Sequence, residues 1–293
     1  MEPTLIASLF GIAATTQIHI AKGLQKYGID ALRSNYVGTY SCEKHAKKKI
    51  LYITGIALNN LAFLWALPAN LFAPPSYYTS AFGFGLVVMM VFSEFFLGEK
   101  HSPLQHIGAA VIAFGTVLIG FASSITEAPA MNHLETKNVL LFVCVFFPLI
   151  FIAFGIVLKL ELKKPMGILC GLLTGCSAAL DPIFKGIGQT TGLQTHLIPH
   201  TAVGWFFFAG SFIFGAMAFL FTQLGFYQHA RASTLVAFHN IALIMLPIIL
   251  LGISLPGFSL TYLQSVGLLL VVCGIALMFM QTTLEMIFRR KRI

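Results

Sequence analysis

The stretch Leu104-Gln105-His106-Ile107-Gly108, followed by Gly115, has a near copy close to the C-terminus in Leu263-Gln264-Ser265-Val266-Gly267, followed by Gly274. In both copies the two glycines are seven residues apart, which is about two turns of an α-helix. The shared spacing indicates two related helices, one in each half of the chain.

A second pair of similar segments precedes the first pair, in the same order. Lys22-Gly23-Leu24 corresponds to Lys185-Gly186-Ile187 at nearly the same displacement along the chain. Two landmarks in one order favour an internal duplication over chance similarity between apolar helices. In a strongly apolar chain, duplicated halves are typical of transporters whose two repeats enclose a site between them.

The composition is that of a membrane protein. Of the 293 residues, 57% are hydrophobic and only 10% are charged, and the mean hydropathy is +0.86, whereas about a quarter of the residues in a soluble domain are charged. The five cysteines include no CxxC pair, so neither a zinc site nor a disulfide framework is indicated. We expect no cofactor, and because no enzyme motif is present we expect no enzyme.

Apolar runs long enough to cross a bilayer as helices, about 20 residues each, occur nine times. We place them at 4–21, 49–68, 76–97, 104–123, 138–158, 166–188, 203–227, 232–252 and 261–281. Backbone polar groups in hydrocarbon must be paired, which excludes an open sheet, and the alternation of a membrane β-barrel is missing. The sequence therefore predicts an all-α polytopic membrane protein of about nine transmembrane helices.

The 18 Lys and Arg residues are distributed unequally between alternate loops. One side holds Lys22, Lys26, Arg33, Lys44, Lys47, Lys48, Lys49, Lys100, Lys159, Lys163, Lys164, Arg231, Arg289, Arg290, Lys291 and Arg292. The other side holds Lys137, and Lys185 lies in a span. This bias predicts an outside N-terminus and a cytoplasmic C-terminus in a multi-pass protein of the cell membrane. It also explains the net charge of +8 by contact with the lipid bilayer, without nucleic acid as a partner.

The predicted orientation makes the two halves opposite in topology. The span at 4–21 runs inward and the span at 166–188 runs outward. Residues 1–123 and 166–293 then form two inverted four-helix repeats, and residues 124–165 form the connector with its one helix. Inverted repeats can exchange conformations and so alternate between inward-open and outward-open states.

Segments spread over most of the chain have counterparts in one known family. They are Phe96-Leu97-Gly98-Glu99-Lys100, the helix from Gly108 to Gly120, Lys185-Gly186-Ile187-Gly188, and Thr222-Gln223 through Thr234-Leu235-Val236. In these segments the chain resembles the drug/metabolite transporter superfamily (EamA-like), and within it the NIPA-type magnesium transporters. The resemblance implies the nine-span architecture and transport, with Mg²⁺ as the cargo.

Asp181 and Lys185 form the most unusual polar pair inside a span. They lie four residues apart and share one helix face, and Pro182 between them removes a backbone donor and favours a break in the helix. An acidic residue in a membrane span is costly, so the pair is a candidate substrate or cation site. A structural ion pair near the outer end of the span is the alternative.

Polar side chains near the middle of two other spans are further candidates for substrate binding. Asn59 and Asn60 in one, and His239 and Asn240 in the other, can meet at the depth where inverted repeats bind substrates. Their amide and imidazole groups can bind a hydrated cation or a polar organic solute. Interhelical hydrogen bonding is the alternative.

Gln17, His19, Glu94 and Gln223 are candidates for gating or coupling. Glu94 lies about one turn before the end of its span, where its carboxylate is a candidate metal ligand together with Asp181. Mg²⁺ keeps several waters and takes one or two carboxylates, so a sparse carboxylate set agrees with it.

The sequence agrees with three different functions. They are a transporter of Mg²⁺ or another divalent cation, an exporter of a small polar metabolite, and a non-transporting subunit of a larger membrane complex that kept the fold. A homodimer is also open.

Overall fold

Helices make up most of the structure, a computed structural model that describes residues 3–32, 42–73, 75–125, 134–159, 163–191, 197–256 and 259–290. In chain order they are α1 (Pro3–Gly28), the short 3₁₀-helix η1 (Ile29–Leu32), α2 (Cys42–Leu61), α3 (Phe63–Phe72), α4 (Pro75–Ser80), α5 (Gly83–Phe96), α6 (Pro103–Ser124), α7 (Thr136–Lys159), α8 (Lys163–Thr190), α9 (Ala202–Tyr227), α10 (Ala232–Ser254) and α11 (Tyr262–Arg290).

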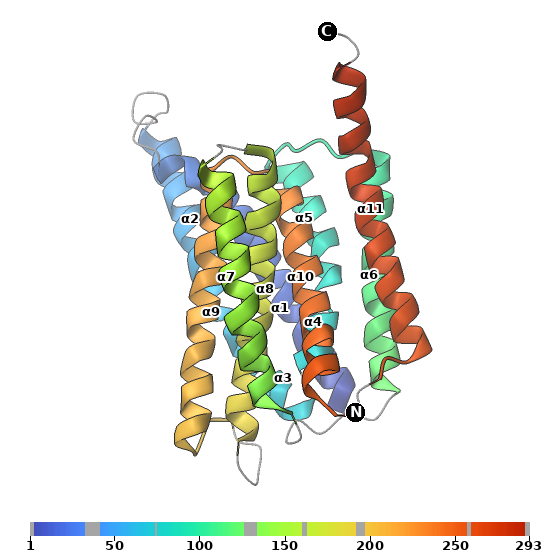
Figure 1. The fold of residues 1–293 in the computed structure, drawn as a ribbon. Coiled ribbons are helices and arrows are strands. Elements are labelled where there is room, and N and C mark those ends of the chain that lie inside the picture. The colour runs from blue at the N-terminus through green and yellow to red at the C-terminus, as the bar shows by residue number, and fades with distance from the viewer. Residues whose placement is uncertain are drawn as a thin grey trace.

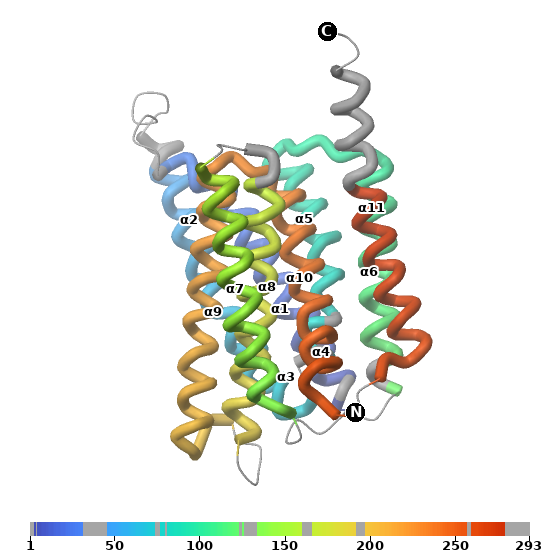
Figure 2. The backbone as a smooth tube through the Cα atoms, viewed as in Figure 1, coloured from blue at the N-terminus to red at the C-terminus, as the bar shows by residue number. Residues whose placement is uncertain are grey.

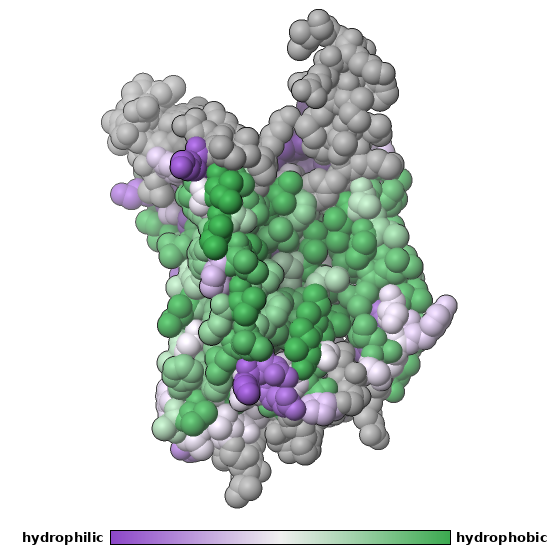
Figure 3. Space-filling model, viewed as in Figure 1, coloured by the Kyte–Doolittle hydropathy of each residue, from purple (hydrophilic) through white to green (hydrophobic). Residues whose placement is uncertain are grey.

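Eight segments in the described part of the chain are long and apolar enough to cross a membrane. They coincide with eight of the predicted spans, and α11 adds a shorter apolar helix over Tyr262–Met278. Figure 3 shows a broad hydrophobic band with more polar ends on the visible face. Helices suit this environment because they pair their backbone groups internally. The prediction of an all-α polytopic membrane protein is confirmed.

The helices form one bundle with α8 in its interior (Figure 1). α8 packs against α9, α10, α7 and α3, and α1 packs against α2, α3, α4 and α5. α6 and α11 lie side by side at one edge (Figures 1 and 2). α1 begins at the lower end of the view and α11 ends at the upper end, as an odd number of crossings requires. Which end is cytoplasmic stays a prediction, and Arg33, Lys291 and Arg292 lie outside the described residues.

The two copies of the repeated motif meet along the contact between α6 and α11. A Cβ atom on Gly108 would lie 2.6 Å from the carbonyl oxygen of Gly274, and a Cβ atom on Gly274 would lie 2.6 Å from that of Gly108. Gly115 and Gly267 are related in the same reciprocal way, at 2.7 and 2.8 Å. Glycine at these positions therefore permits the close antiparallel packing of the two helices.

Both helices also begin with the same reciprocal cap. The Ser102 hydroxyl accepts a hydrogen bond from the Gln105 N–H, and the Gln105 side chain accepts one from the Ser102 N–H. Thr261 and Gln264 make the same two bonds before α11. The glutamine of each Leu-Gln motif is thus one half of a capping box. The division of the chain into two inverted repeats and a connector stays a prediction.

Replacing Gly108 with alanine is expected to destabilise the protein by about 1–3 kcal/mol, the usual cost of overpacking. Gly155 of α7 is the matched control, because a Cβ atom there meets nothing within 4 Å. Gly155→Ala should leave the midpoint of unfolding in denaturing detergent unchanged or slightly raised. Equal midpoints for the two variants would show that this close contact does not stabilise the protein.

The second and third predicted spans are each broken into two helices. The breaks fall at Ala62, between α2 and α3, and at Ala81-Phe82, between α4 and α5. Hydrogen bonds at both breaks join residues three apart, as in a 3₁₀ turn. At the second break Thr15 and Asn240 both donate side-chain hydrogen bonds to the Phe82 carbonyl, each at 3.2 Å. Neighbouring helices thereby add side-chain hydrogen bonds to the backbone at this turn, besides the one from the Gly85 N–H.

Two local predictions were wrong. The first helix does not end near residue 21 but continues to Gly28. Lys22 is therefore a residue of α1 that is buried in the bundle, and it does not lie in a cytoplasmic loop. The expected break at Pro182 is absent, because α8 is continuous from Lys163 to Thr190. The side-chain amide of Asn70 donates to the Pro182 carbonyl at 3.2 Å and joins α3 to this part of α8.

Candidate substrate cavity

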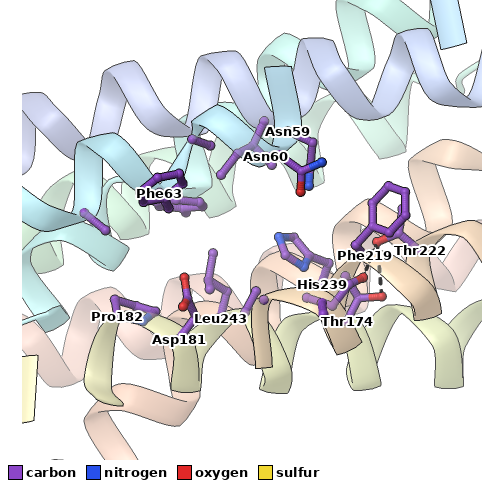
Figure 4. Close-up of a pocket in the computed structure, with 18 of the residues that line it drawn as sticks. Asn59, Asn60, Phe63, Thr174, Asp181, Pro182, Phe219, Thr222, His239 and Leu243 are labelled. Carbon is purple, nitrogen blue, oxygen red and sulfur yellow. Dashed lines mark hydrogen bonds between the residues drawn. The ribbon is translucent and has the colours of Figure 1, made fainter. Parts of the chain in front are cut away.

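A cavity of about 230 Å³ lies in the bundle between α1, α2, α3, α4, α8, α9 and α10. Its polar wall residues are Lys22, Asn59, Asn60, Tyr78, Thr174, Asp181, Lys185, Thr222 and His239. The rest of the wall is aliphatic and aromatic. Figure 4 shows Asn59 and Asn60 facing His239 across the cavity, with Asp181 farther along α8. Apolar walls with a few convergent polar groups are the usual form of a small-molecule site.

Asp181 and Lys185 form an ion pair on one face of α8, in which the side chains are 18% and 1% exposed. The ammonium group of Lys185 also lies over the rings of Phe212 and Phe63, at 4.9 and 5.8 Å from their centroids. The carboxylate and the two aromatic faces compensate the buried charge. Lys185 is therefore enclosed within the bundle.

Lys22 is a cavity residue that was not among the predicted site residues. Its side chain is 3% exposed, and its Nζ is buried without a hydrogen-bond partner among the described residues. The lysine lines the cavity together with His239. The sequence contains a signal that could have identified Lys22, because Lys22-Gly23 matches Lys185-Gly186 in the second half. In the structure both lysines line the cavity.

The structure brings Asn59, Asn60 and His239 together, as predicted, in the cavity wall. Asn59 and Asn60 occupy the last turn of α2, before the break at Ala62. Their side-chain amides make no hydrogen bond to another described residue, and both ring nitrogens of His239 lack a partner there. These groups are free to bind a solute.

His19 and Asn240 do not line the cavity but hold the break between α4 and α5. His19 Nε2 lies 3.1 Å from Asn240 Oδ1, and His19 Nδ1 lies 2.6 Å from the Thr15 carbonyl oxygen. The Asn240 amide nitrogen donates to the Phe82 carbonyl. Because both side chains are buried with their hydrogen bonds used inside the protein, their placement agrees with the alternative of interhelical hydrogen bonding.

Side-chain hydrogen bonds join neighbouring helices beyond each end of the cavity. About one turn beyond Lys22 on α1, Gln25 accepts a hydrogen bond from Gln223 at 2.6 Å, and Tyr52 donates to Gln223 at 2.8 Å. About one turn beyond Lys185 on α8, Gln189 accepts a hydrogen bond from Asn70 at 3.2 Å. A gating or coupling role for Gln223 stays a prediction.

Gln17 joins α1 to both helices of the broken second span. Its side chain donates to the Leu58 carbonyl at 2.8 Å and accepts from the Trp65 indole at 2.8 Å. Leu58 precedes the break at Ala62 and Trp65 follows it. Gln17 therefore stabilises the break at Ala62, which follows Asn59 and Asn60 at the end of α2.

Glu94 lies away from the cavity, near the end of α5. Its carboxylate pairs with His106 at 3.4 Å, and both side chains are 48% exposed. Next to it, Ser93 Oγ lies 2.7 Å from His101 Nε2, and burial lowers the pKa of His101 below its ordinary value. Glu94 and Asp181 are thus not brought together, and no group of three or more metal-ligating side chains occurs among the described residues.

A polar cavity inside a bundle of apolar helices is characteristic of membrane transporters. The chain is similar to such a protein. Its relative is the "Probable magnesium transporter NIPA9" of Arabidopsis thaliana, with 26% identity over 198 residues. The match covers 64% of this chain and only 57% of the relative's length. No protein-family model matches the chain, and no solved structure matches it. The relative and the apolar helices support a membrane transporter.

Proposed function

We propose that this protein is a NIPA-like transporter that moves a small polar solute through the central cavity by alternating access. The observation that carries the proposal is the cavity itself, in which the free side-chain groups of Asn59, Asn60 and His239 face one another. The layers at Gln25–Gln223 and Asn70–Gln189 lie beyond its two ends. In the proposed cycle these two sets of hydrogen bonds are the candidate gates.

Two inverted repeats, residues 1–123 and 166–293, would supply the two halves of that cycle. The reciprocal glycine contacts of α6 and α11, together with their matching capping boxes, support this division. In this scheme α6 and α11 form the scaffold at the edge of the bundle. The broken helices α2–α3 and α4–α5 provide the interruptions that transporters place beside their sites.

A bulky side chain in the cavity should stop transport without unfolding the protein. Gly215 lines the cavity, and a Cβ atom there would be in ordinary contact with Asp181 at 3.8 Å. Gly215→Trp in proteoliposomes should lower flux at least about tenfold, because the indole occupies the solute's space. Gly155→Trp adds the same side chain where nothing lies within 4 Å and should transport normally.

The flux assay compares Mg²⁺, inorganic phosphate, small carboxylates, amino acids and amines, with and without an imposed proton gradient. At least one solute should cross faster than in protein-free liposomes, and Gly215→Trp should remove the difference. Absence of flux for every solute, together with stoichiometric copurification of other membrane proteins, would overturn the proposal in favour of a non-transporting subunit.

Mg²⁺ is a second candidate cargo, favoured by the name of the relative. Asp181 would be its ligand, because Mg²⁺ is bound through one or two carboxylates while it keeps several waters. In the structure this carboxylate is already paired with Lys185. Saturable Mg²⁺ uptake that disappears in Gly215→Trp would assign this cargo to the cavity.

A further inference from the structure

We propose that the transported solute carries a carboxylate or phosphate group, and that Lys22 binds this group. The inference rests on the proposed transport function and names the chemical class of its substrate. It begins from the charges in the cavity wall. Among the described residues that line it, two ammonium groups, Lys22 and Lys185, face one carboxylate, Asp181.

The buried charges of the two lysines differ in the partners that stabilise them. Lys185 is paired with Asp181 and lies over two aromatic rings. Lys22 is equally buried, yet its Nζ has no hydrogen-bond partner among the described residues. A buried ammonium ion without an anion is costly in a membrane interior. An anionic solute beside Lys22 would supply the missing partner.

The comparison of the two halves indicates where that anion would lie. Lys22-Gly23 matches Lys185-Gly186, and the residue four positions before each lysine is Ile18 in the first half and Asp181 in the second. Ile18 also lines the cavity. The second half thus carries its own carboxylate on the face of its lysine, whereas the first half leaves this position apolar. The anion of the solute would occupy the place beside Lys22 that corresponds to the carboxylate of Asp181.

The surrounding wall suits a small anion. The side-chain amides of Asn59 and Asn60 carry hydrogen-bond donors that can complete the shell of an oxyanion. The cavity of about 230 Å³ is smaller than the roughly 300–1,000 Å³ typical of drug-sized ligands. A free cation would instead meet the uncompensated ammonium group of Lys22. These features favour a small carboxylate or phosphate compound over Mg²⁺.

The test measures ligand-induced thermal stabilisation of the purified full chain in detergent at constant ionic strength. The probes are inorganic phosphate, succinate and a small phosphate monoester, with chloride and MgCl₂ as comparisons. Wild type should be stabilised by at least one anionic probe. Lys22→Gln should weaken that probe at least about tenfold, because a hydrogen bond to a charged group is lost. Lys22→Arg, which keeps the charge, should retain most of the binding.

Two further variants separate this role from a purely structural one. Ile18→Asp places a carboxylate four residues before Lys22, as Asp181 stands before Lys185; it should raise the melting temperature without ligand and abolish anion binding. Lys137→Gln removes an exposed lysine and should bind anions as wild type does. If Lys22→Gln does not fold, Ile18→Asp still decides the question.

The inference is overturned if no anionic probe stabilises the wild type, or if Lys22→Gln or Ile18→Asp binds the probe as well as the wild type does. Flux of Mg²⁺, an amine or an uncharged solute without anion binding would support the transport function and contradict an anionic substrate. Anion binding without flux would support the anion site at Lys22 and contradict the transport function. Phosphate alone and the organic probes distinguish an inorganic from an organic substrate.

Discussion

Lys185→Met is expected to lower the free energy of unfolding by about 3–5 kcal/mol, the cost of leaving one partner of a buried ion pair uncompensated. Asp181 would remain in the cavity wall with its side chain 18% exposed and without its ammonium partner. Asp181→Asn should be similarly destabilising, because Lys185 is 1% exposed and keeps only the rings of Phe212 and Phe63. Unfolding in mixed detergent micelles measures both changes.

The double variant Asp181→Asn/Lys185→Met should recover most of the lost stability, because neutral residues of similar size often replace a buried pair without cost. Lys137→Met, an exposed substitution on α7, is the control and should change stability by less than about 0.5 kcal/mol. Additive losses in the double variant would mean that the two charges do not compensate each other. The same double variant in the flux assay shows whether the pair also takes part in transport.

Asn240→Leu should separate the stability of the broken helix from solute binding. Asn240 is 1% exposed, and its amide bonds both to His19 and to the Phe82 carbonyl. The Phe82 carbonyl would keep its bond from Thr15, whereas leucine would leave His19 Nε2 without this partner, at a cost of about 1–3 kcal/mol. The expected result is a loss of that size in the free energy of unfolding and a loss of flux that follows from it.

Asn59→Leu is the matched change on the other side of the cavity. The Asn59 amide faces the cavity and makes no hydrogen bond to another described residue, so stability should change by less than about 0.5 kcal/mol. Flux or solute affinity should nevertheless fall, because a cavity donor and acceptor are removed. The reverse pattern, with a destabilised Asn59 variant and a stable Asn240 variant, would contradict this assignment of roles.

Part of the candidate site was predictable from residue type and spacing. Asp181 and Lys185 share a face because an α-helix brings residues four apart together, and Asn59, Asn60 and His239 were placed at one depth by their position within their spans. Lys22 was not predicted to line the site, because a lysine near the end of an apolar run is expected to lie in a loop. Glu94 was placed too close to the site because sequence position alone does not show which way a helix face is turned.

The sequence by itself determined the membrane class, the positions of most spans and the repeated Leu-Gln motif. These follow from local physics: apolar length sets a span, and the reciprocal Ser102–Gln105 and Thr261–Gln264 bonds set a helix start. That α6 and α11 pack against each other through their glycines was shown by the tertiary structure. Only the tertiary structure decided where helices break and which polar groups are already used. The Phe82 carbonyl at the turn between α4 and α5 accepts hydrogen bonds from Thr15 and Asn240, which are distant in sequence. Lys22 lacks a hydrogen-bond partner among the described residues, and this depends on which side chains the surrounding helices bring to it.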